Sequence, residues 1–433
     1  MPGKPSNTRT IKVGMMARVE GEGALHVTVR DQEVQDVQLR IFEPPRFFEA
    51  FLQGRHYSEV PDIVARICGI CPVAYQMSAV HALEPIFGIE VPQSIRILRR
   101  LLYCAEWIES HALHIYMLHA PDFLGYASGI EMAKDYPDIV KRGLRLKKVG
   151  NQLLTLLGGR SVHPVSVKVG GFSRIPSKRE LETLREDLLW ARDAAIDTVQ
   201  WTAAFEFTDL EHEYTFVALR SAMDYPMNEG LVASNRGLEI SAVNFEQQFQ
   251  EVQVPYSNAL HCLFNGQSYL AGPLARLHLN FDRLSPLVKE VLSTTELFLP
   301  FKQASQGIVA RSLEILHAVD EALRIIEQYK DSKDASVSVS PRAGTGMAIT
   351  EAPRGLLYHR YQINEDGTIQ VAKIVPPTSQ NQRRIEEDLR AFLPHILDRP
   401  DEEVALQCEK IVRSYDPCIS CATHFLKFRI KKI

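Results

Sequence analysis

The sequence lacks the features that mark membrane, secreted and nucleic-acid-binding proteins. Its 433 residues contain no uninterrupted apolar run long enough to cross a bilayer. The N-terminus, MPGKPSNTRTIKV, has no apolar stretch of the secretory kind. Basic residues are scattered and the formal net charge is only −4, so the chain carries no electrostatic footprint for nucleic acid. We therefore expect a cytoplasmic, globular protein with no transmembrane segment and no nucleic-acid partner.

Cysteine is scarce and odd in number, because the chain has only seven. Without a secretory signal disulfides are not expected, and an odd count does not suit a disulfide framework. Cys104, Cys262 and Cys408 stand singly and are expected to be buried, inert thiols. The remaining four form two Cys-x-x-Cys pairs, in RICGICPVAYQ (66–76) and DPCISCATH (416–424).

Repeats, low-complexity tracts and long polar linkers are also missing, so we expect a single large domain over residues 1–433. The pattern is mainly α with small β-sheets, an α+β fold. Alternation predicts a small antiparallel sheet over 10–42, and Asp366-Gly367 predicts the turn of a hairpin over 356–375. Apolar residues at three- and four-residue spacing predict a helical core over about 60–330. The individual helices expected are 94–120, 177–205 (capped by Ser177 with Glu180), one from Pro286, one within 303–329 and two within 380–414.

The two cysteine pairs can direct four thiolates at one centre, which suits zinc, an iron–sulfur cluster or another soft metal. A zinc ribbon normally brings its second pair about 15–20 residues after the first, whereas Cys418 lies 350 residues after Cys68. A thioredoxin-like role also fits poorly, because neither pair follows the first strand of a βαβ unit. A catalytic metal, a structural metal and a redox dithiol all stay open as hypotheses from the cysteines alone.

Charged side chains elsewhere in the sequence favour the catalytic interpretation. Asp416 and His424 flank the second pair, while Glu20 lies in RVEGEG, Glu49 in RFFEAF and Arg354 in EAPRG. A structural zinc site needs none of these residues. A reactive metal needs proton carriers and a charged donor aimed at an anionic ligand. The sequence therefore favours a catalytic metal site over a structural metal, and both over a redox dithiol.

Seven segments, taken in order, resemble the large, catalytic subunit of nickel–iron hydrogenases over essentially the whole chain. They are RVEGEG, RFFEAFLQGR, RICGICPVA, GGRSVHPVSVKVGG, GPLAR, EAPRG and DPCISCATH. Within that family, RICGICPVAYQ and VPPTSQNQ are most similar to the soluble, multi-subunit branch that exchanges electrons with NAD(P). The resemblance implies the hydrogenase large-subunit fold, with a central bundle of long helices, and reversible oxidation of H2 to protons and electrons.

The resemblance also implies a Ni–Fe centre whose iron carries CO and cyanide. Cys68 and Cys418 would be terminal ligands of nickel, and Cys71 and Cys421 would bridge nickel and iron. Cys418 would take the proton from H2 and pass it to Glu20, which matches the family's proton carrier.

A charged donor would cover the open face of this centre. Arg354, beside Pro353, would place its planar guanidinium over that face. Asp416 and Asp122 would hold the guanidinium in place.

Two further positions match the family's pocket for diatomic ligands, namely Pro377 and Thr378. Many relatives have serine or threonine where Pro377 stands, so this chain lacks a side-chain donor there. Many also have histidine where Tyr75 stands, although a tyrosine can still donate one hydrogen bond.

Near the C-terminus, Glu49, His424 and a main-chain carbonyl near Lys373 match the family's ligands of a buried Mg²⁺. Large subunits of the family are commonly made with an extension that a maturation protease cuts just after the residue matching His424. Residues 425–433, FLKFRIKKI, follow that position. We therefore expect active enzyme to end with the metal-binding segment 416–424.

No cysteine is left in a cluster pattern, and no G-x-G-x-x-G precedes a helix. Electrons would therefore leave through a separate iron–sulfur small subunit, and the family branch implies further flavin, NAD(P)-binding and iron–sulfur subunits. Two alternatives stay open. One is a hydrogen-sensing regulatory hydrogenase subunit. The other is a metal-free scaffold subunit of a quinone-reducing complex, which should lack both cysteine pairs.

Overall fold

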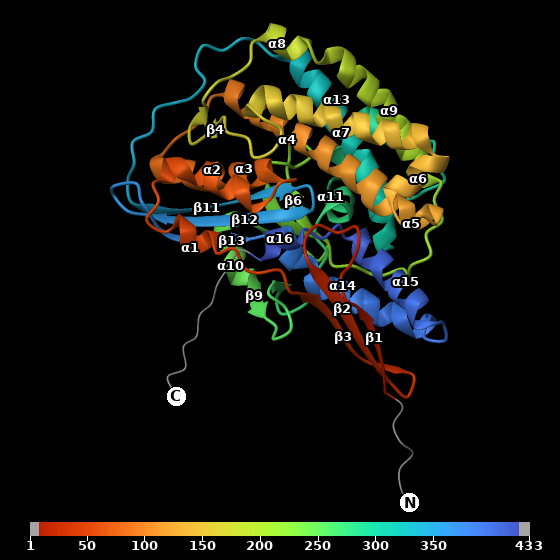
Figure 1. Cartoon of the computed structure of the whole chain (residues 1–433). Helices are drawn as coiled ribbons and strands as arrows, with labels where there is room; N and C mark the ends of the chain where they lie inside the picture. Colours follow the sequence, from red (N-terminus) through yellow and green to blue (C-terminus); the bar gives the residue numbers. More distant parts are fainter. Residues whose placement is uncertain (1–7, 424–433) are drawn as a thin grey trace, which may run out of the picture.

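Long helices dominate the computed structural model, which describes residues 8–423 (Figure 1). The longest form a bundle of α4 (Gln93–Leu113), α7 (Pro137–Gly158), α9 (Arg185–Ala203) and α13 (Gly307–Gln328). The remaining α-helices are α1 (Phe48–Leu52), α2 (Val60–Val64), α3 (Pro72–Phe87), α5 (Ala120–Leu124), α6 (Gly129–Asp135), α8 (Lys178–Glu182), α10 (Phe245–Gln248), α11 (Pro273–Asn280), α12 (Pro286–Ser293), α14 (Pro377–Phe392), α15 (Asp401–Ser414) and α16 (Ile419–Ala422). Within residues 8–423, no helix combines the length and apolar character needed to span a bilayer.

Small antiparallel sheets complete the fold. Their strands are β1 (Thr8–Val13), β2 (Gly23–Arg30), β3 (Glu33–Ile41), β4 (Val167–Lys168), β5 (Gly171–Phe172), β6 (Val217–Arg220), β7 (Leu231–Ser234), β8 (Glu239–Ile240), β9 (Phe249–Gln253), β10 (Leu260–Phe264), β11 (Gly344–Ala352), β12 (Gly355–Ile363) and β13 (Ile369–Val375). The predicted fold class, mainly α with small β-sheets, is confirmed.

The bundle is built around α4, which packs against both α7 and α13. The helix predicted over 94–120 is present, but after Leu113 it widens into a π-helical turn over His114–His119. His114 Nε2 lies 2.9 Å from Arg413 O, and His119 Nε2 lies 3.3 Å from Ser414 Oγ. The turn therefore ties the end of α15, just before the second cysteine pair, to the helix bundle.

The sheet β11–β12–β13 lies under α3, which carries the first cysteine pair at its start (Figure 1). β12 and β13 form the hairpin predicted around Asp366-Gly367, whereas β11 was not predicted. Gly346 of β11 allows α3 to approach closely, because a Cβ at that position would lie 2.1 Å from Ala82 O. Ala352 pairs with Gly355, so the β11–β12 hairpin turns at Pro353 and Arg354.

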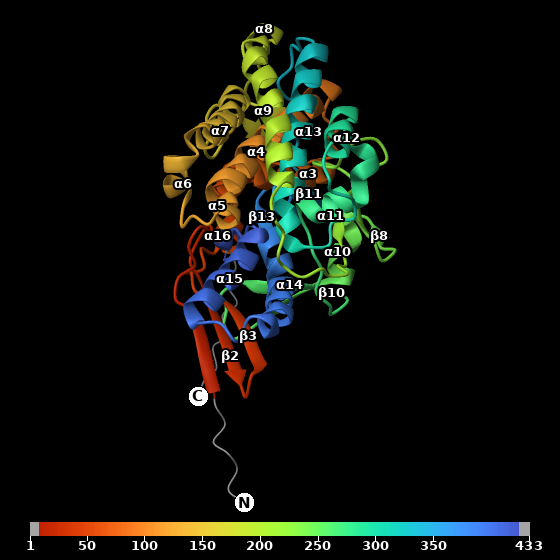
Figure 2. The same ribbon diagram turned by 90° about the vertical axis from the view of Figure 1, so that its right-hand side faces the viewer.

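The N-terminal sheet β1–β3 falls where the sequence predicts a small sheet over 10–42. Figure 2 shows it beside α14 and α15, which come from the other end of the chain. β3 packs on α14 and β1 on α15, and Glu386 of α14 accepts a hydrogen bond from Leu39 N at 2.9 Å. Segments far apart in sequence are thus neighbours, which allows two distant cysteine pairs to meet.

The predicted helical core over about 60–330 is wrong in one part, because β6–β10 occupy much of residues 217–264. These strands are two to five residues long and build a second apolar cluster with residues of β11–β13. Strands this short carry little periodicity, and tertiary pairing decides their conformation.

The helix predicted over 177–205 has its expected capping box at Ser177 and Glu180, but it breaks between Glu182 and Arg185. Thr183 Oγ1 donates to Glu180 O at 2.6 Å at this break. Such a bond competes with the helical backbone pattern.

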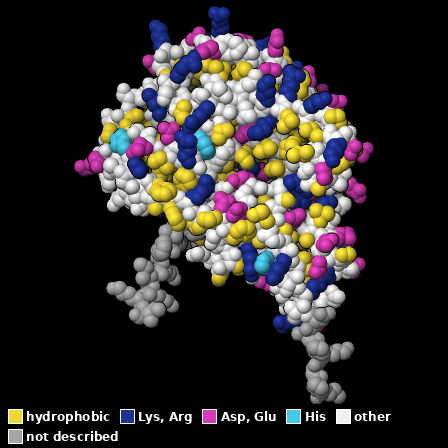
Figure 3. Space-filling view, viewed as in Figure 1, with side chains coloured by type: hydrophobic (Ala, Val, Ile, Leu, Met, Phe, Trp, Pro, Cys, Tyr) yellow, Lys and Arg dark blue, Asp and Glu magenta, His cyan; other side chains and the backbone are white. Residues whose placement is uncertain are grey.

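The surface mixes both signs of charge. On the face shown in Figure 3, lysine and arginine side chains lie among aspartate and glutamate side chains, with apolar side chains between them. No extended field of one sign covers this face, so it offers a polyanion no broad electrostatic attraction.

The close contact between α4 and α7 gives a stability prediction. A Cβ at Gly150 would lie 2.7 Å from Ala105 O and 2.8 Å from Glu109 N. We expect Gly150→Ala to force the helices apart and to lower the free energy of unfolding by about 1–3 kcal/mol, measured as a lower thermal unfolding temperature. Gly14→Ala is the control, because no described atom lies within 4 Å of the added methyl group. Equal stability of the two variants would contradict the close contact.

Candidate metal centre

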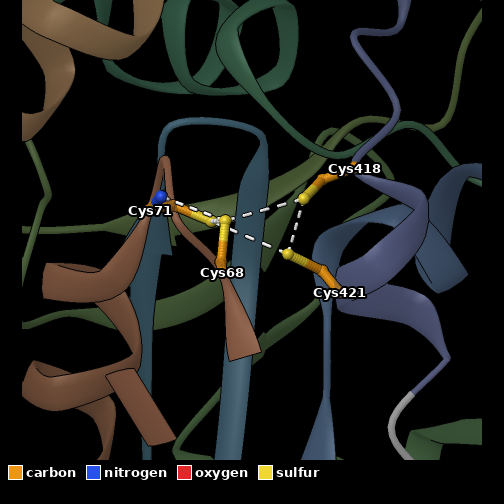
Figure 4. A group of neighbouring side chains, drawn as sticks. All are labelled: Cys68, Cys71, Cys418 and Cys421. Carbon is orange, nitrogen blue, oxygen red and sulfur yellow. Dashed lines mark hydrogen bonds between the residues drawn. The ribbon is translucent and has the colours of Figure 1, made fainter. Parts of the chain in front are cut away.

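Four buried thiols converge in the core. The Sγ atoms of Cys68, Cys71, Cys418 and Cys421 all lie within 4.8 Å of one another (Figure 4). The sulfurs are 2.7 Å apart in the first pair and 2.6 Å apart in the second. Between pairs, Cys68 lies 3.6 Å from Cys418 and Cys71 lies 3.7 Å from Cys421. Each of these residues is at most 3% exposed, so the group forms a dry site for a soft metal centre.

The start of α3 shapes the first pair. Pro72 follows Cys71 at the first helical position, where its missing N–H is not needed. The N–H groups of Ile70 and Cys71 point at Cys68 Sγ, at 3.4 and 3.0 Å. Backbone donors therefore support negative charge on the Cys68 sulfur.

A carboxylate that the sequence analysis missed fixes the same helix start. Glu106 of α4 is fully buried and accepts hydrogen bonds from Val73 N at 2.6 Å and Ala74 N at 3.1 Å. It satisfies two donors that no residue within α3 can satisfy. The signal available in the sequence was an acidic residue among the apolar residues of LLYCAEWI.

The second pair is held by residues from two distant segments. Cys418 N donates to Thr378 Oγ1 at 2.9 Å, and Ile419 N donates to Glu20 O at 2.9 Å. Glu20 and Cys418 also form an isolated parallel bridge. The loop of RVEGEG and the start of α14 thus position the second pair from both sides.

Arg46, which the sequence analysis also missed, links the two pairs directly. Its Nη2 donates to Ile67 O at 2.6 Å, next to the first pair, and also to Ser420 O within the second pair. Its backbone N–H donates to Thr423 O at 2.8 Å. One guanidinium therefore ties both cysteine loops together.

The protonation of the thiols is uneven. Burial alone would raise the pKa of Cys68, but hydrogen bonds from the other three thiols and the charge of Arg354 lower it well below its usual value. The pKa values of Cys71, Cys418 and Cys421 are raised instead, and burial is the largest cause. Without a cation, the site therefore resists holding several thiolates at once, and a multivalent metal would replace the protons.

Glu20 lies beside the second pair. Cys418 Sγ donates to Glu20 Oε2 at 3.1 Å, and the same oxygen accepts from Ser420 N at 3.0 Å. Ser420 Oγ contacts the other carboxylate oxygen. Glu20 is half-buried, whereas Cys418 is buried.

Arg354, at the tip of the β11–β12 hairpin, is buried and pairs with Asp416, as the sequence predicts. Its Nε donates to Asp416 O at 2.8 Å and its Nη2 to Asp416 Oδ1 at 3.0 Å. Burial opposes the charge, but Asp416 and the cysteine thiolates raise the pKa of Arg354 well above its usual value. Arg311, which was not predicted, lies behind Asp416 with an Nε–Oδ2 distance of 4.0 Å. The site is therefore covered by fixed positive charge.

The predicted contact between Asp122 and Arg354 is wrong. Asp122 accepts hydrogen bonds from Arg413 Nε at 2.7 Å and Nη2 at 2.9 Å, and from Arg18 Nη2 at 2.5 Å. Burial raises the pKa of Asp122, but these two arginines outweigh it and lower the pKa. Two nearer guanidinium groups occupy the carboxylate, so Asp122 joins α5 to α15 and the N-terminal segment.

The pocket residues predicted around the centre lie close to the cysteines. Thr378 bonds to Cys418 N, as described above, and Pro377 precedes it at the start of α14. Tyr75 is fully buried in the first turns of α3. Burial, and then the charges of the four cysteines, raise the pKa of its phenol. Pro353 shares the hairpin tip with Arg354.

Two buried donors at this site suit polar ligands on a metal. Within residues 8–423, neither Arg354 Nη1 nor the Tyr75 hydroxyl has a hydrogen-bond partner. Buried donors normally find a partner. Four soft thiols with two such donors beside them fit a metal centre that carries small polar ligands.

The predicted magnesium ligands are only partly within the described residues. Glu49 Oε1 accepts a hydrogen bond from Ile374 N at 2.8 Å, so this carboxylate lies against the backbone next to Lys373. The Lys373 side chain points elsewhere, with Nζ 3.4 Å from Glu246 Oε2 and 3.7 Å from Glu251 Oε2. His424 lies outside the described residues, as does the tail 425–433.

Comparison with known proteins gives a consistent result. The chain matches the family model of nickel-dependent hydrogenase over residues 46–138 and 222–424. It is 35% identical over 420 residues to sulfhydrogenase 2 subunit alpha of Pyrococcus furiosus, covering 96% of this chain and 99% of that protein. It is 27% identical to the NAD-reducing hydrogenase HoxS subunit beta of Cupriavidus necator, covering 97% of this chain and 95% of that protein.

The fold is also that of a solved hydrogenase. The crystal structure of an NAD+-reducing NiFe hydrogenase in the H2-reduced state matches with a TM-score of 0.86 and 25% identity, covering 97% of this chain and 100% of that chain. Four convergent buried thiols, a family match over most of the chain and a relative 35% identical along nearly its whole length agree. The chain therefore belongs to the nickel-dependent hydrogenases and is the large, catalytic subunit of a nickel–iron hydrogenase.

Proposed function

We propose that this subunit oxidises H2 reversibly, to two protons and two electrons, at a Ni–Fe centre held by its four convergent cysteines. The observation that carries the proposal is the convergence of four buried thiols within 4.8 Å. Cys68 and Cys418 would be the terminal ligands of nickel, and Cys71 and Cys421 would bridge to an iron that carries CO and cyanide. When bound, the centre supplies the two soft metals at which H2 is split.

Protons would leave through Glu20. Its Oε2 lies 3.1 Å from Cys418 Sγ, within the distance needed for direct proton transfer. Ser420 holds the carboxylate with its N–H at 3.0 Å and with its hydroxyl, so the acceptor stays aimed at the thiol. Because Glu20 is half-buried, it can pass the proton on toward solvent.

The pocket above the centre would be lined by Arg354, Tyr75, Pro353, Pro377 and Thr378. Arg354 Nη1 and the Tyr75 hydroxyl are buried donors that can hydrogen-bond to cyanide. The Thr378 hydroxyl accepts from a backbone N–H and can still donate its own proton. Pro353 and Pro377 offer no side-chain donor, so they would contribute shape and exclude water.

A Mg²⁺ ion would bind near the end of the chain. Glu49 lies against the Ile374 N–H, at 2.8 Å, which brings it next to the Lys373 carbonyl expected to join it. His424 would supply the third protein ligand. Oxygen ligands and retained waters suit this ion.

Electrons would leave through a separate subunit. Burial raises the pKa of Cys104 and of Cys408 to about 12, and that of Cys262 also rises, so these thiols are protonated and inert. We therefore propose an iron–sulfur small subunit as direct partner. The NAD-reducing relative and the sequence resemblance support further flavin and NAD(P)-binding subunits. With NAD(P) as the proposed acceptor, the complex would work in the cytoplasm.

The sequence leaves two alternative functions open. A metal-free scaffold of a quinone-reducing complex has no use for four buried, convergent thiols, so the site disfavours it. A hydrogen-sensing subunit would use the same centre with slow turnover. Turnover and partner identity separate that function from the proposed one.

Metal content gives the first test of the proposed function. In purified mature protein, this subunit should contain nickel and iron in near-equal amounts, with infrared bands from iron-bound CO and cyanide. Cys421→Ser should abolish stable metal assembly, because a hydroxyl is a poor ligand for soft metals. Cys408→Ser is the matched control, since Cys408 is equally buried but outside the cluster, and it should keep its metals. Zinc without infrared bands in wild-type protein would refute the Ni–Fe centre.

A second prediction tests the proton route. Glu20→Gln keeps the shape of the side chain but cannot carry a proton, so turnover and H/D exchange should fall by about 10²–10⁴-fold. The infrared bands should stay almost unchanged. Glu22→Gln makes the same substitution two residues later, at an exposed position, and should leave turnover intact. Full activity of Glu20→Gln would mean that protons leave elsewhere.

A third prediction concerns the partners. The complex purified without a tag should contain an iron–sulfur subunit and should reduce NAD(P) with H2, whereas the isolated subunit should not. The measurement is identification of the partners by mass, followed by NAD(P)H formation under H2. A complex with slow turnover and no NAD(P)-binding subunit would favour the hydrogen-sensing function instead.

A further inference from the structure

Two motifs named in the sequence, GPLAR (272–276) and EAPRG (351–355), meet in the core, and the proposed reaction gives the first of them no role. EAPRG forms the turn of the β11–β12 hairpin, where Ala352 pairs with Gly355 and Arg354 stands at the tip. Asp416 holds the guanidinium of Arg354, but the place from which that side chain starts is set by the backbone of the hairpin tip.

Arg276, the last residue of GPLAR, uses all of its N–H donors, and three of them bind that hairpin. A guanidinium has five N–H groups. Nε and Nη2 bind Glu314 in a bidentate pair, both at 2.7 Å, and Nη1 binds Glu351 Oε2 at 2.9 Å. The two remaining donors bind backbone carbonyls, Ala352 O at 2.9 Å and Pro353 O at 2.8 Å. Those carbonyls belong to the two residues immediately before Arg354.

The guanidinium itself is anchored rigidly. Arg276 is fully buried, and its guanidinium lies over the Trp107 ring at 4.4 Å from the centroid. Trp107 Nε1 also donates to Glu351 O at 3.2 Å. Glu314 is fixed in turn by Tyr225 OH at 2.8 Å. The carbonyls of three successive residues, 351–353, are therefore held by side chains that cannot easily move.

The first residue of GPLAR supports the tip from another side. Gly272 has φ +112°, and a Cβ there would lie 2.8 Å from Arg354 O. Gly355 has φ +134°, and a Cβ there would lie 2.9 Å from Gly272 N. Both glycines allow a backbone contact that any side chain would push apart.

We propose that Arg276 and Gly272 are positioning residues, which clamp the β11–β12 tip and so aim Arg354 at the metal centre. This inference rests on the proposed function, since it assigns Arg354 to the face where H2 reacts. Misplacing a group that acts in the reaction by about 1 Å can cost about 100-fold in rate. A purely structural role would instead lower stability without altering the centre.

The test compares Arg276→Lys with Arg99→Lys. Arg99 is also buried and makes a bidentate pair with Glu84, at 2.8 and 2.5 Å, so its hydrogen bonds within the described residues go to that carboxylate and not to the hairpin. Lysine keeps the charge and loses the planar fork. We expect Arg276→Lys to lower kcat by about 100-fold, with nickel content unchanged and the cyanide infrared bands shifted. Arg99→Lys should leave the bands and kcat near wild type.

A second pair of variants tests the inference independently, in case Arg276→Lys does not fold. Gly272→Ala should press on Arg354 O and produce the same shift of the cyanide bands. Gly170→Ala is its control, because Gly170 has φ +86° and its Cβ would lie 2.8 Å from Val337 O, so the clash again falls on a backbone carbonyl but on one outside EAPRG. Hydrogen exchange of residues 351–356, measured by mass spectrometry, should rise in Arg276→Lys and Gly272→Ala and not in the two controls.

The exchange measurement needs no metal, so it tests the clamp separately from the proposed function. Unshifted bands and unchanged exchange in both Arg276→Lys and Gly272→Ala would overturn the inference while leaving the Ni–Fe centre intact. Wild-type protein without nickel would overturn the function, and exchange at the tip would still decide whether Arg276 holds the hairpin.

Discussion

Four thiol groups are buried in one space that excludes water, and most features around them reduce the free-energy cost of that burial. Removing several thiolates from water is costly unless nearby charge and hydrogen bonds compensate. The chain supplies fixed positive charge from Arg354 and Arg311, which share Asp416. It also supplies backbone donors, since two N–H groups point at Cys68 Sγ. Metals complete the compensation, because each binding step releases a proton that the buried site would otherwise retain.

The site belongs to no single element. The RVEGEG loop contributes Glu20 O to the backbone of the second pair, α14 contributes Thr378, and the segment before α1 contributes Arg46, which reaches both pairs. Glu20 and Arg46 reach the second pair from the other end of the chain, so the geometry of the site depends on how sheet β1–β3, α14 and the bundle pack together. The fold therefore acts as one support for the centre, and a change in any of these segments can alter the metals.

Residue types and motifs predicted the ligands, but not all of their neighbours. The spacing of the cysteine pairs and the EAPRG segment led to the thiol site and to the Arg354–Asp416 contact. The predicted partner of Asp122, Arg354, was wrong. Several arginines lie in this region, and the sequence does not show which of them lies closest to the carboxylate. Glu106 and Arg276 were missed for a related reason. Their importance comes from which backbone groups they meet, and the tertiary fold alone decides that. The short strands β6–β10 escaped prediction because pairing, and not local pattern, defines them.

The separation of the two pairs also has a consequence in time. Ribosomes add on the order of 5–20 residues per second, so a gap of 350 residues means that the first pair waits on the order of tens of seconds for the second. During that interval half of a soft-metal site is open to any ion in the cell. Divalent copper binds such ligands more tightly than nickel, and iron binds more weakly than either. Equilibrium affinity would therefore select the wrong metals, and the order in which ions are delivered has to decide what the finished site contains.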